Sequence, residues 1–239
     1  MNDTLDTAKK LDLKQDFNIA VKLSGEKYTY VELIEFLSSG KDVEKQLAAL
    51  ELNEIRSKQD ASVLVSNLVG QDGKIREVIA FKINEFIKKE EYVNFFTGEE
   101  FFEIFLQGIM DINGNICRMV VELTSIDGFK KYLANKLPER ITEILEQIEK
   151  LEKNEKQYKI SKRNFQLYWC LEALYNIIDV VDVEKIQQII FQAGEFEDYT
   201  IREKIAKILA GIDSPVFEIL KKSLKNDSNY YVRRYLAVD

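Results

Sequence analysis

Apolar residues recur along most of the chain with the spacing of an amphipathic helix. In six places a β-branched or aromatic residue is followed, four and five positions later, by two further apolar or small residues. Residues at i, i+4 and i+5 lie on one face of a helix, and a small residue at i+5 lets a neighbouring helix approach closely. The six instances are Val43/Leu47/Ala48, Ile75/Ile79/Ala80, Ile116/Val120/Val121, Phe165/Trp169/Cys170, Ile201/Ile205/Ala206 and Val232/Leu236/Ala237. The pattern predicts six helices, each packed against its neighbours.

Each of these helices follows another apolar-periodic segment and a short turn. The turns contain Gly, Asp or Asn, which tolerate left-handed backbone or cap the next helix. The expected pairs are 30–38 with 43–55, 61–69 with 74–87, 99–112 with 115–126, 139–156 with the helix around Trp169, 183–193 with 200–212, and 215–224 with 230–238. The repeat spacing predicts insertions at 90–98 and 127–137, the second with a short helix over 129–136. Pro138 is expected at the start of the next helix.

The first thirty residues read differently from the rest. Residues 1–16 have few apolar positions and predict a flexible tail. Residues 17–30 alternate apolar and polar positions around the turn Ser24-Gly25-Glu26, which predicts a small β-hairpin cap on the first repeat. A helix over residues 11–23 is the alternative, and the β-branched and aromatic residues there disfavour it.

Three of the six motifs carry arginine directly after the first apolar residue, and an aspartate lies a few positions before each. These are Ile75-Arg76 with Asp72, Ile201-Arg202 with Asp198, and Val232-Arg233 with Asp227. This arrangement resembles the HEAT-repeat family. The resemblance covers nearly all of the chain and implies an all-α fold, an α-solenoid of about six HEAT-like helical pairs over residues 31–239. It also implies that the arginines form a ladder with aspartates and turn carbonyls; phosphate binding by the same arginines is the alternative interpretation.

Composition narrows the chemistry. The 239 residues include no histidine, which removes the commonest general base and metal ligand. The two cysteines, Cys117 and Cys170, lie on predicted helices and are expected to be buried small hydrophobic residues. No nucleotide-binding or nucleophile motif occurs, so we expect a non-enzymatic protein with no catalytic residues, no cofactor and no metal.

Charge and hydropathy bear on partners and compartment. A formal net charge of −7 disfavours nucleic acid, because affinity for phosphates comes mainly from lysine and arginine. No apolar run reaches the length of a membrane span, and the start of the chain lacks signal-peptide features, so a cytoplasmic protein without a membrane partner is expected. The HEAT resemblance implies a scaffold or adaptor that binds a protein or peptide. The alternatives are an accessory or chaperone-like subunit of an enzyme system, resembling lyase-like HEAT proteins, and a HEAT-like DNA alkylation repair protein, which the acidic helices disfavour.

In repeats two to four, one face of the later helix is unexpectedly apolar. Of the nine positions opposite the predicted core, at i+3, i+6 and i+10 in repeats two to four, seven are apolar or aromatic and two are glutamates. The candidate binding strip comprises Val78, Phe81, Glu85, Met119, Glu122, Tyr168, Leu171 and Tyr175, with Ile126 at its edge. Such a strip suits an amphipathic segment that bears basic residues. The alternative is that these side chains pack against neighbouring helices, and the exposure of Phe81, Met119 and Tyr168 decides between the two.

Overall fold

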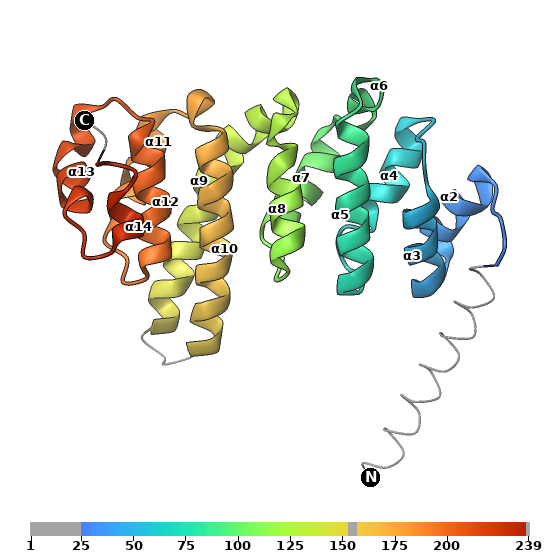
Figure 1. The fold of residues 1–239 in the computed structure, drawn as a ribbon, viewed down its shortest axis with the longest axis horizontal. Helices are drawn as coiled ribbons and strands as arrows, with labels where there is room; N and C mark the ends of the chain where they lie inside the picture. Colours follow the sequence, from blue (N-terminus) through green and yellow to red (C-terminus); the bar gives the residue numbers. More distant parts are fainter. Residues whose placement is uncertain (1–24, 153–156, 238–239) are drawn as a thin grey trace, which may run out of the picture. The chain divides into compact units, whose positions relative to one another are not determined.

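The protein is helical throughout the residues that its computed structural model describes, 25–152 and 157–237, and these contain no strand (Figure 1). The chain divides into two compact units, Met1–Phe96 and Thr97–Asp239. The predicted tail and the first strand of the predicted hairpin lie outside the described residues. Within 25–30 the chain forms a turn, and Tyr30 is already the first residue of a helix.

The described residues of the first unit, 25–96, form two helix pairs. Its elements are α2 (Tyr30–Ser39), α3 (Asp42–Glu51), α4 (Lys58–Ser66), α5 (Gly73–Ile87), α6 (Glu90–Val93) and the 3-10 helix η1 (Asn94–Phe96). Helix α2 contacts α3 and α4, and α3 contacts α5, so the first helices of the pairs form one layer and the second helices another. Thr29 opens α2 with a capping box, in which Glu32 Oε2 accepts the Thr29 N–H at 2.7 Å. Ser57 and Asp72 cap α4 and α5.

The insertion after α5 packs back onto the same unit. Phe96 is fully buried, and its ring stacks on that of Phe86 with the centroids 6.3 Å apart. Tyr92 meets the same Phe86 ring edge-on at 5.2 Å. Phe95, which precedes Phe96 in the chain, is half-buried. Phe96 is therefore part of the core of the first unit.

The second unit contains four helix pairs among its described residues. Its elements are α7 (Glu99–Ile109), α8 (Gly114–Glu122), η2 (Leu123–Ser125), α9 (Asp127–Glu152), α10 (Gln157–Asn176), η3 (Ile178–Val180), α11 (Val183–Gly194), α12 (Tyr199–Ala210), η4 (Pro215–Phe217), α13 (Glu218–Lys225) and α14 (Tyr230–Arg233). Helices α7, α9, α11 and α13 contact one another in sequence, and so do α8, α10, α12 and α14. This stacking of helix pairs in chain order is the predicted α-solenoid architecture.

Helix α9 differs from the prediction. The short helix expected over 129–136 and the helix expected after Pro138 are one continuous helix, with the proline inside it. Proline in a helix interior loses one hydrogen bond and costs about 3 kcal/mol. Here the buried stripe of Leu133 and Leu137 continues without a break into Ile141 and Ile144. Apolar burial on both sides of Pro138 offsets the cost, so the proline does not mark a helix start.

The arginines of the repeated motif hold the turns that precede their helices. Arg202 Nη1 donates to the carbonyls of Phe196 and Glu197 at 2.6 and 2.7 Å. Arg233 Nη1 donates to the carbonyls of Asp227 and Ser228 at 2.6 and 2.8 Å, the same relative positions thirty-one residues on.

Two further contacts extend this ladder. Arg202 also forms a bidentate ion pair with Asp227 of the next repeat, with Nε–Oδ2 at 2.7 Å, and Arg76 donates to the carbonyl of Gln71. The predicted ladder is thus present. Asp72 and Asp198 act instead as N-caps, and Arg118 Nη2 donates to Asn115 Oδ1 at 3.4 Å.

Most motif residues form the core, but Val43, Leu47 and Phe165 are only half-buried, and the fourth and sixth motifs depart further from the prediction. Ile75, Ile116 and Ile201 are buried with their partners, and Ala206 is fully buried. Trp169, predicted to be buried, is half-buried, and its ring packs edge-on against Phe165 and Tyr168. In the last motif Val232 is buried, whereas Leu236 is half-buried and Ala237 exposed, because α14 ends at Arg233.

The cysteines are buried as predicted. Burial raises the pKa of both thiols to about 12, so both are protonated at neutral pH. None of the helices in residues 25–152 and 157–237 combines the length and the hydropathy that crossing a bilayer requires.

Candidate functional site

The candidate binding strip divides between the two units. Val78, Phe81 and Glu85 lie on α5 in the first unit, and the other members lie on α8 and α10 in the second. On α5, Phe81 leaves 50% of its surface exposed and Val78 is half-buried. These residues therefore form a surface of the first unit by themselves.

Carboxylates flank Phe81 on α5. Glu77 and Glu85 lie one helical turn before and after it, on the same face. Glu85 is exposed and forms an ion pair with Lys82 Nζ at 3.0 Å, while the Lys82 side chain itself is 9% exposed. The exposed aromatic ring thus lies between acidic groups. We call Val78, Phe81 and Glu85 the α5 surface.

In the second unit the strip is only partly exposed. Met119 is half-buried and Glu122 is exposed on α8. Leu171 is fully buried, and so is most of Ile126, which removes both from any surface a partner could reach. The sequence prediction for Leu171 is wrong because α10 contacts helices on several sides, α7, α8 and α9 as well as α12. A helix enclosed in this way is apolar around more than one face.

Tyr168 and Tyr175 are half-buried beneath two lysines of the neighbouring helix. Lys204 Nζ lies 4.2 Å from the centroid of the Tyr168 ring, and Lys207 Nζ lies 3.9 Å from that of Tyr175. Both ammonium groups also bind one carboxylate, Glu172, at 2.6 and 2.9 Å. These five residues, which we call the α10–α12 cluster, join two adjacent second helices by cation–π contacts and ion pairs.

Electrostatics hold the α10–α12 cluster in its charged form. Burial by itself would raise the pKa of Glu172, but the hydrogen bonds from Lys204 and Lys207 outweigh it and lower the pKa below its ordinary value. Burial acts in the opposite sense on Lys204, and the bond to Glu172 raises its pKa above the ordinary value. The charges are therefore compensated inside the cluster, and the tyrosine faces under the lysines are closed to a partner.

The sequence prediction missed Glu172, which is at the centre of this cluster. It lies at i+7 from Phe165, between the positions compared across the repeats, although it shares a helix face with Tyr168 and Tyr175. Lys204 and Lys207 occupy the compared positions of the next repeat. The sequence signal for this cluster was that the compared positions include tyrosines on α10 and lysines on the next second helix, α12.

An exposed tyrosine patch at the start of α12 and α14 was also missed. Tyr199, Tyr230 and Tyr231 are 41%, 64% and 50% exposed, and the Tyr199 and Tyr231 rings stack at 6.4 Å. Arg234 lies over the Tyr231 ring and pairs with Glu203 at 2.7 Å. The sequence signal is the pair Tyr230-Tyr231 directly after Asn229, which caps α14. Tyrosine and arginine are enriched in protein interfaces.

Metal-binding geometry is not found in the described part of the chain, where no three His, Cys, Asp or Glu side chains are grouped to hold an ion. Three buried polar atoms have no hydrogen-bond partner: Gln147 Oε1, Asn164 Oδ1 and Trp169 Nε1. Gln147 lies on α9, and Asn164 and Trp169 lie on α10.

Comparison with solved structures finds a similarity of fold. The chain is similar to a designed armadillo repeat protein, YIII(Dq)4CqI, with 14% identity and a TM-score of 0.45, over 86% of this chain and 95% of the designed protein. A similarity at this level carries no weight for function, and the solenoid assignment rests on the helix pairing itself. No protein-family model matches the sequence, and no curated protein matches it. The resemblance to HEAT repeats is therefore supported only as far as a helical-repeat architecture.

Proposed function

We propose that this chain is a non-enzymatic helical-repeat protein that binds a protein or peptide partner. The observation that carries the proposal is the half-exposed Phe81 on α5, an aromatic side chain on the second-helix layer with carboxylates one turn on either side. Exposed aromatic residues with a polar rim are typical of protein-binding surfaces. Solenoids present such residues on stacked helices, where the backbone is held rigidly by the neighbouring repeats.

The chemistry of the α5 surface favours a particular kind of segment. Phe81 and Val78 offer apolar contact, and Glu77 and Glu85 add negative charge beside it. An amphipathic segment with an apolar anchor and basic residues next to it complements both features. The Lys82 ion pair does not prevent this, because Glu85 remains exposed and a second cation can share its carboxylate.

The second unit contributes in a more restricted way. Met119 and Glu122 remain candidate contacts on α8, since one is half-buried and the other exposed. Tyr168 and Tyr175 are already engaged by Lys204 and Lys207, so we assign them to structure and not to recognition. We therefore keep the α5 surface as the proposed binding surface of the first unit, and Met119 and Glu122 as separate candidate contacts on the second.

The test is partner capture by a Phe81→Ser variant of the full chain. We expect this variant to lose most of the partner recovered by affinity purification from the native host, while its melting temperature changes by less than about 3 °C, because half of the side chain is solvated in the free protein. Val31→Ser is the matched control, since Val31 is 69% exposed on α2, in the first-helix layer of the same unit.

Two results would count against the proposal. Equal recovery of the same proteins by Phe81→Ser and the wild type would show that the α5 surface is not used. Equal loss in both serine variants would show that the effect is not specific to that surface.

A further inference from the structure

The last two helix pairs of the second unit share their motif contacts at an offset of thirty-one residues. Arg202 and Arg233 bind carbonyls at the same relative positions, as described above, and Ile201 and Val232 are both buried. A residue on α11 can therefore be compared with the residue thirty-one positions later on α13.

Compared with α11, helix α13 lacks the two residues that contact the following helix pair. On α11, Phe191 packs against the Phe217 ring at 5.6 Å, and Gly194 lies so close to Leu220 that an added Cβ would be 2.9 Å from its methyl carbons. These two residues receive the following helix pair. Their equivalents on α13 are Lys222 and Lys225, both exposed. Another helix packed in the same way would bury two ammonium groups at high cost. The outer side of α13 therefore differs from a standard repeat interface.

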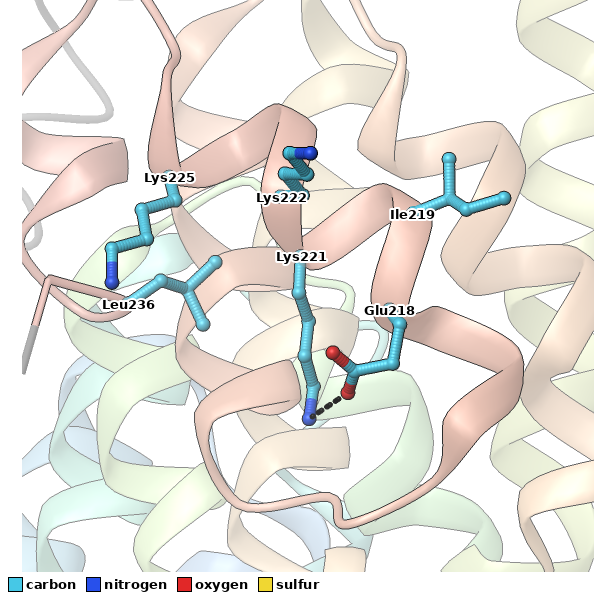
Figure 2. Close-up of a pocket in the computed structure, with 6 residues that line it drawn as sticks. All are labelled: Glu218, Ile219, Lys221, Lys222, Lys225 and Leu236. Carbon is cyan, nitrogen blue, oxygen red and sulfur yellow. Dashed lines mark ion pairs between the residues drawn. The ribbon is translucent and has the colours of Figure 1, made fainter. Parts of the chain in front are cut away.

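A pocket of about 440 Å³ lies on this side of α13 (Figure 2). It is lined by Glu218, Ile219, Lys221, Lys222, Lys225 and Leu236. Ile219 is 85% exposed, the largest exposed fraction among the large hydrophobic residues described. Leu236, from the segment after α14, adds a second apolar side chain and lies near Lys225 in Figure 2.

The lysines around the pocket have different roles. Lys221 is held by the protein, because its Nζ donates to the Ile212 carbonyl at 2.7 Å and lies 3.6 Å from Glu218. Lys222 and Lys225 are both exposed on the rim, and Lys225 also has an interaction within the chain. The two apolar residues are thus bordered by three lysines and one carboxylate, Glu218, which gives the rim a net positive charge on a protein whose formal net charge is −7.

We propose that this surface, Ile219, Lys222, Lys225 and Leu236, binds an acidic amphipathic segment of a partner protein. Apolar side chains of that segment contact Ile219 and Leu236, and its carboxylates pair with Lys222 and Lys225. Charge complementarity selects this occupant, because a basic segment such as the one proposed for the α5 surface is repelled here. The chain then has two docking surfaces of opposite charge preference.

The test uses a fluorescent synthetic peptide of about four helical turns, with leucines on one face and glutamates on the other. Fluorescence anisotropy with the full chain measures binding. We expect saturable binding that weakens as the salt concentration rises from about 0.05 M to about 0.5 M. The same peptide with lysine in place of glutamate should bind at least about tenfold more weakly.

Variants locate the site. Lys222→Glu with Lys225→Glu, and separately Ile219→Ser, should each weaken binding by about tenfold or more. Lys159→Glu with Lys162→Glu, an equal charge change on α10, should bind as the wild type does. If circular dichroism shows that the α13 charge-reversal variant does not fold, the Ile219→Ser variant by itself tests whether the peptide binds at this surface. That variant is expected to fold, because the Ile219 side chain is almost fully solvated.

Three results would overturn the proposal. The acidic peptide could bind the α13 and control variants equally, or the lysine peptide could bind as tightly as the acidic one. Sedimentation could also show a wild-type dimer that Ile219→Ser dissociates, in which case a second copy of this chain occupies the surface.

Discussion

Replacing Ala206 with glutamate should unfold the C-terminal helix pairs. Ala206 is fully buried on α12, where the added carboxylate has no room and no partner. An unpaired buried charge of this kind costs at least about 4 kcal/mol. In a protein of this size about 1 kcal/mol lowers the melting temperature by about 2–4 °C, so we expect a decrease of about 8 °C or more.

Hydrogen exchange should locate the damage. Repeats mainly stabilise their immediate neighbours, so amides of α11 to α14 should lose protection first. The control is Ala210→Glu, at an exposed position on the same helix, which should cost less than about 1 kcal/mol. A melting temperature for Ala206→Glu within about 2 °C of the wild type would mean that the helix packing assigned here is wrong.

Replacing Glu172 with glutamine should destabilise the second unit by disrupting the α10–α12 cluster. The substitution leaves Lys204 and Lys207 near each other without their shared carboxylate, and the Lys204 side chain is only 10% exposed. The expected loss is about 2 kcal/mol, between that of an exposed pair and that of a fully buried one. Glu139→Gln, at an exposed position on α9, is the control and should have little effect.

The pH dependence gives this prediction a second readout. The pKa of Glu172 is lower in the folded protein than its ordinary value of 4.5, so its contribution is fully present above that pH. It is lost as the pH falls through the folded pKa. The difference in unfolding free energy between the wild type and Glu172→Gln should therefore be constant from neutral pH to about 5.5 and shrink below 4.5. A difference that grows on acidification would contradict the charged cluster.

The fold could be predicted from the sequence wherever the helical spacing of apolar residues agreed with the turn residues around it. The helix pairs and their turns were predictable because apolar spacing, Gly and Asx residues agreed at each repeat. Pro138 was misread because a local rule about helix starts gave way to a buried stripe that continues on both sides of it. Such an outcome depends on tertiary packing, which the local pattern around a proline does not contain.

The site was predictable only in part, for a related reason. The prediction that residues opposite the core face are exposed assumes a helix with only one buried side. Helix α5 meets this condition at Phe81, which is half-exposed. Helix α10 does not, because helices contact it on several sides, and so Leu171 is buried and Tyr168 is covered. The position of Lys204 over Tyr168 depends on how two helices align across repeats. Spacing within either helix gives no information about that alignment.

The proposed role is tested most directly by site-specific photo-crosslinking from the α5 surface in cells of the native host. The photoreactive residue p-benzoylphenylalanine replaces Phe81 in one variant and Val31 in another, both at exposed positions of the first unit. We predict that position 81 crosslinks to one defined protein through a segment with apolar and basic residues, and that position 31 does not. Identical crosslinks from both positions, or none from position 81 while the chain is folded and expressed, would contradict partner binding at the α5 surface.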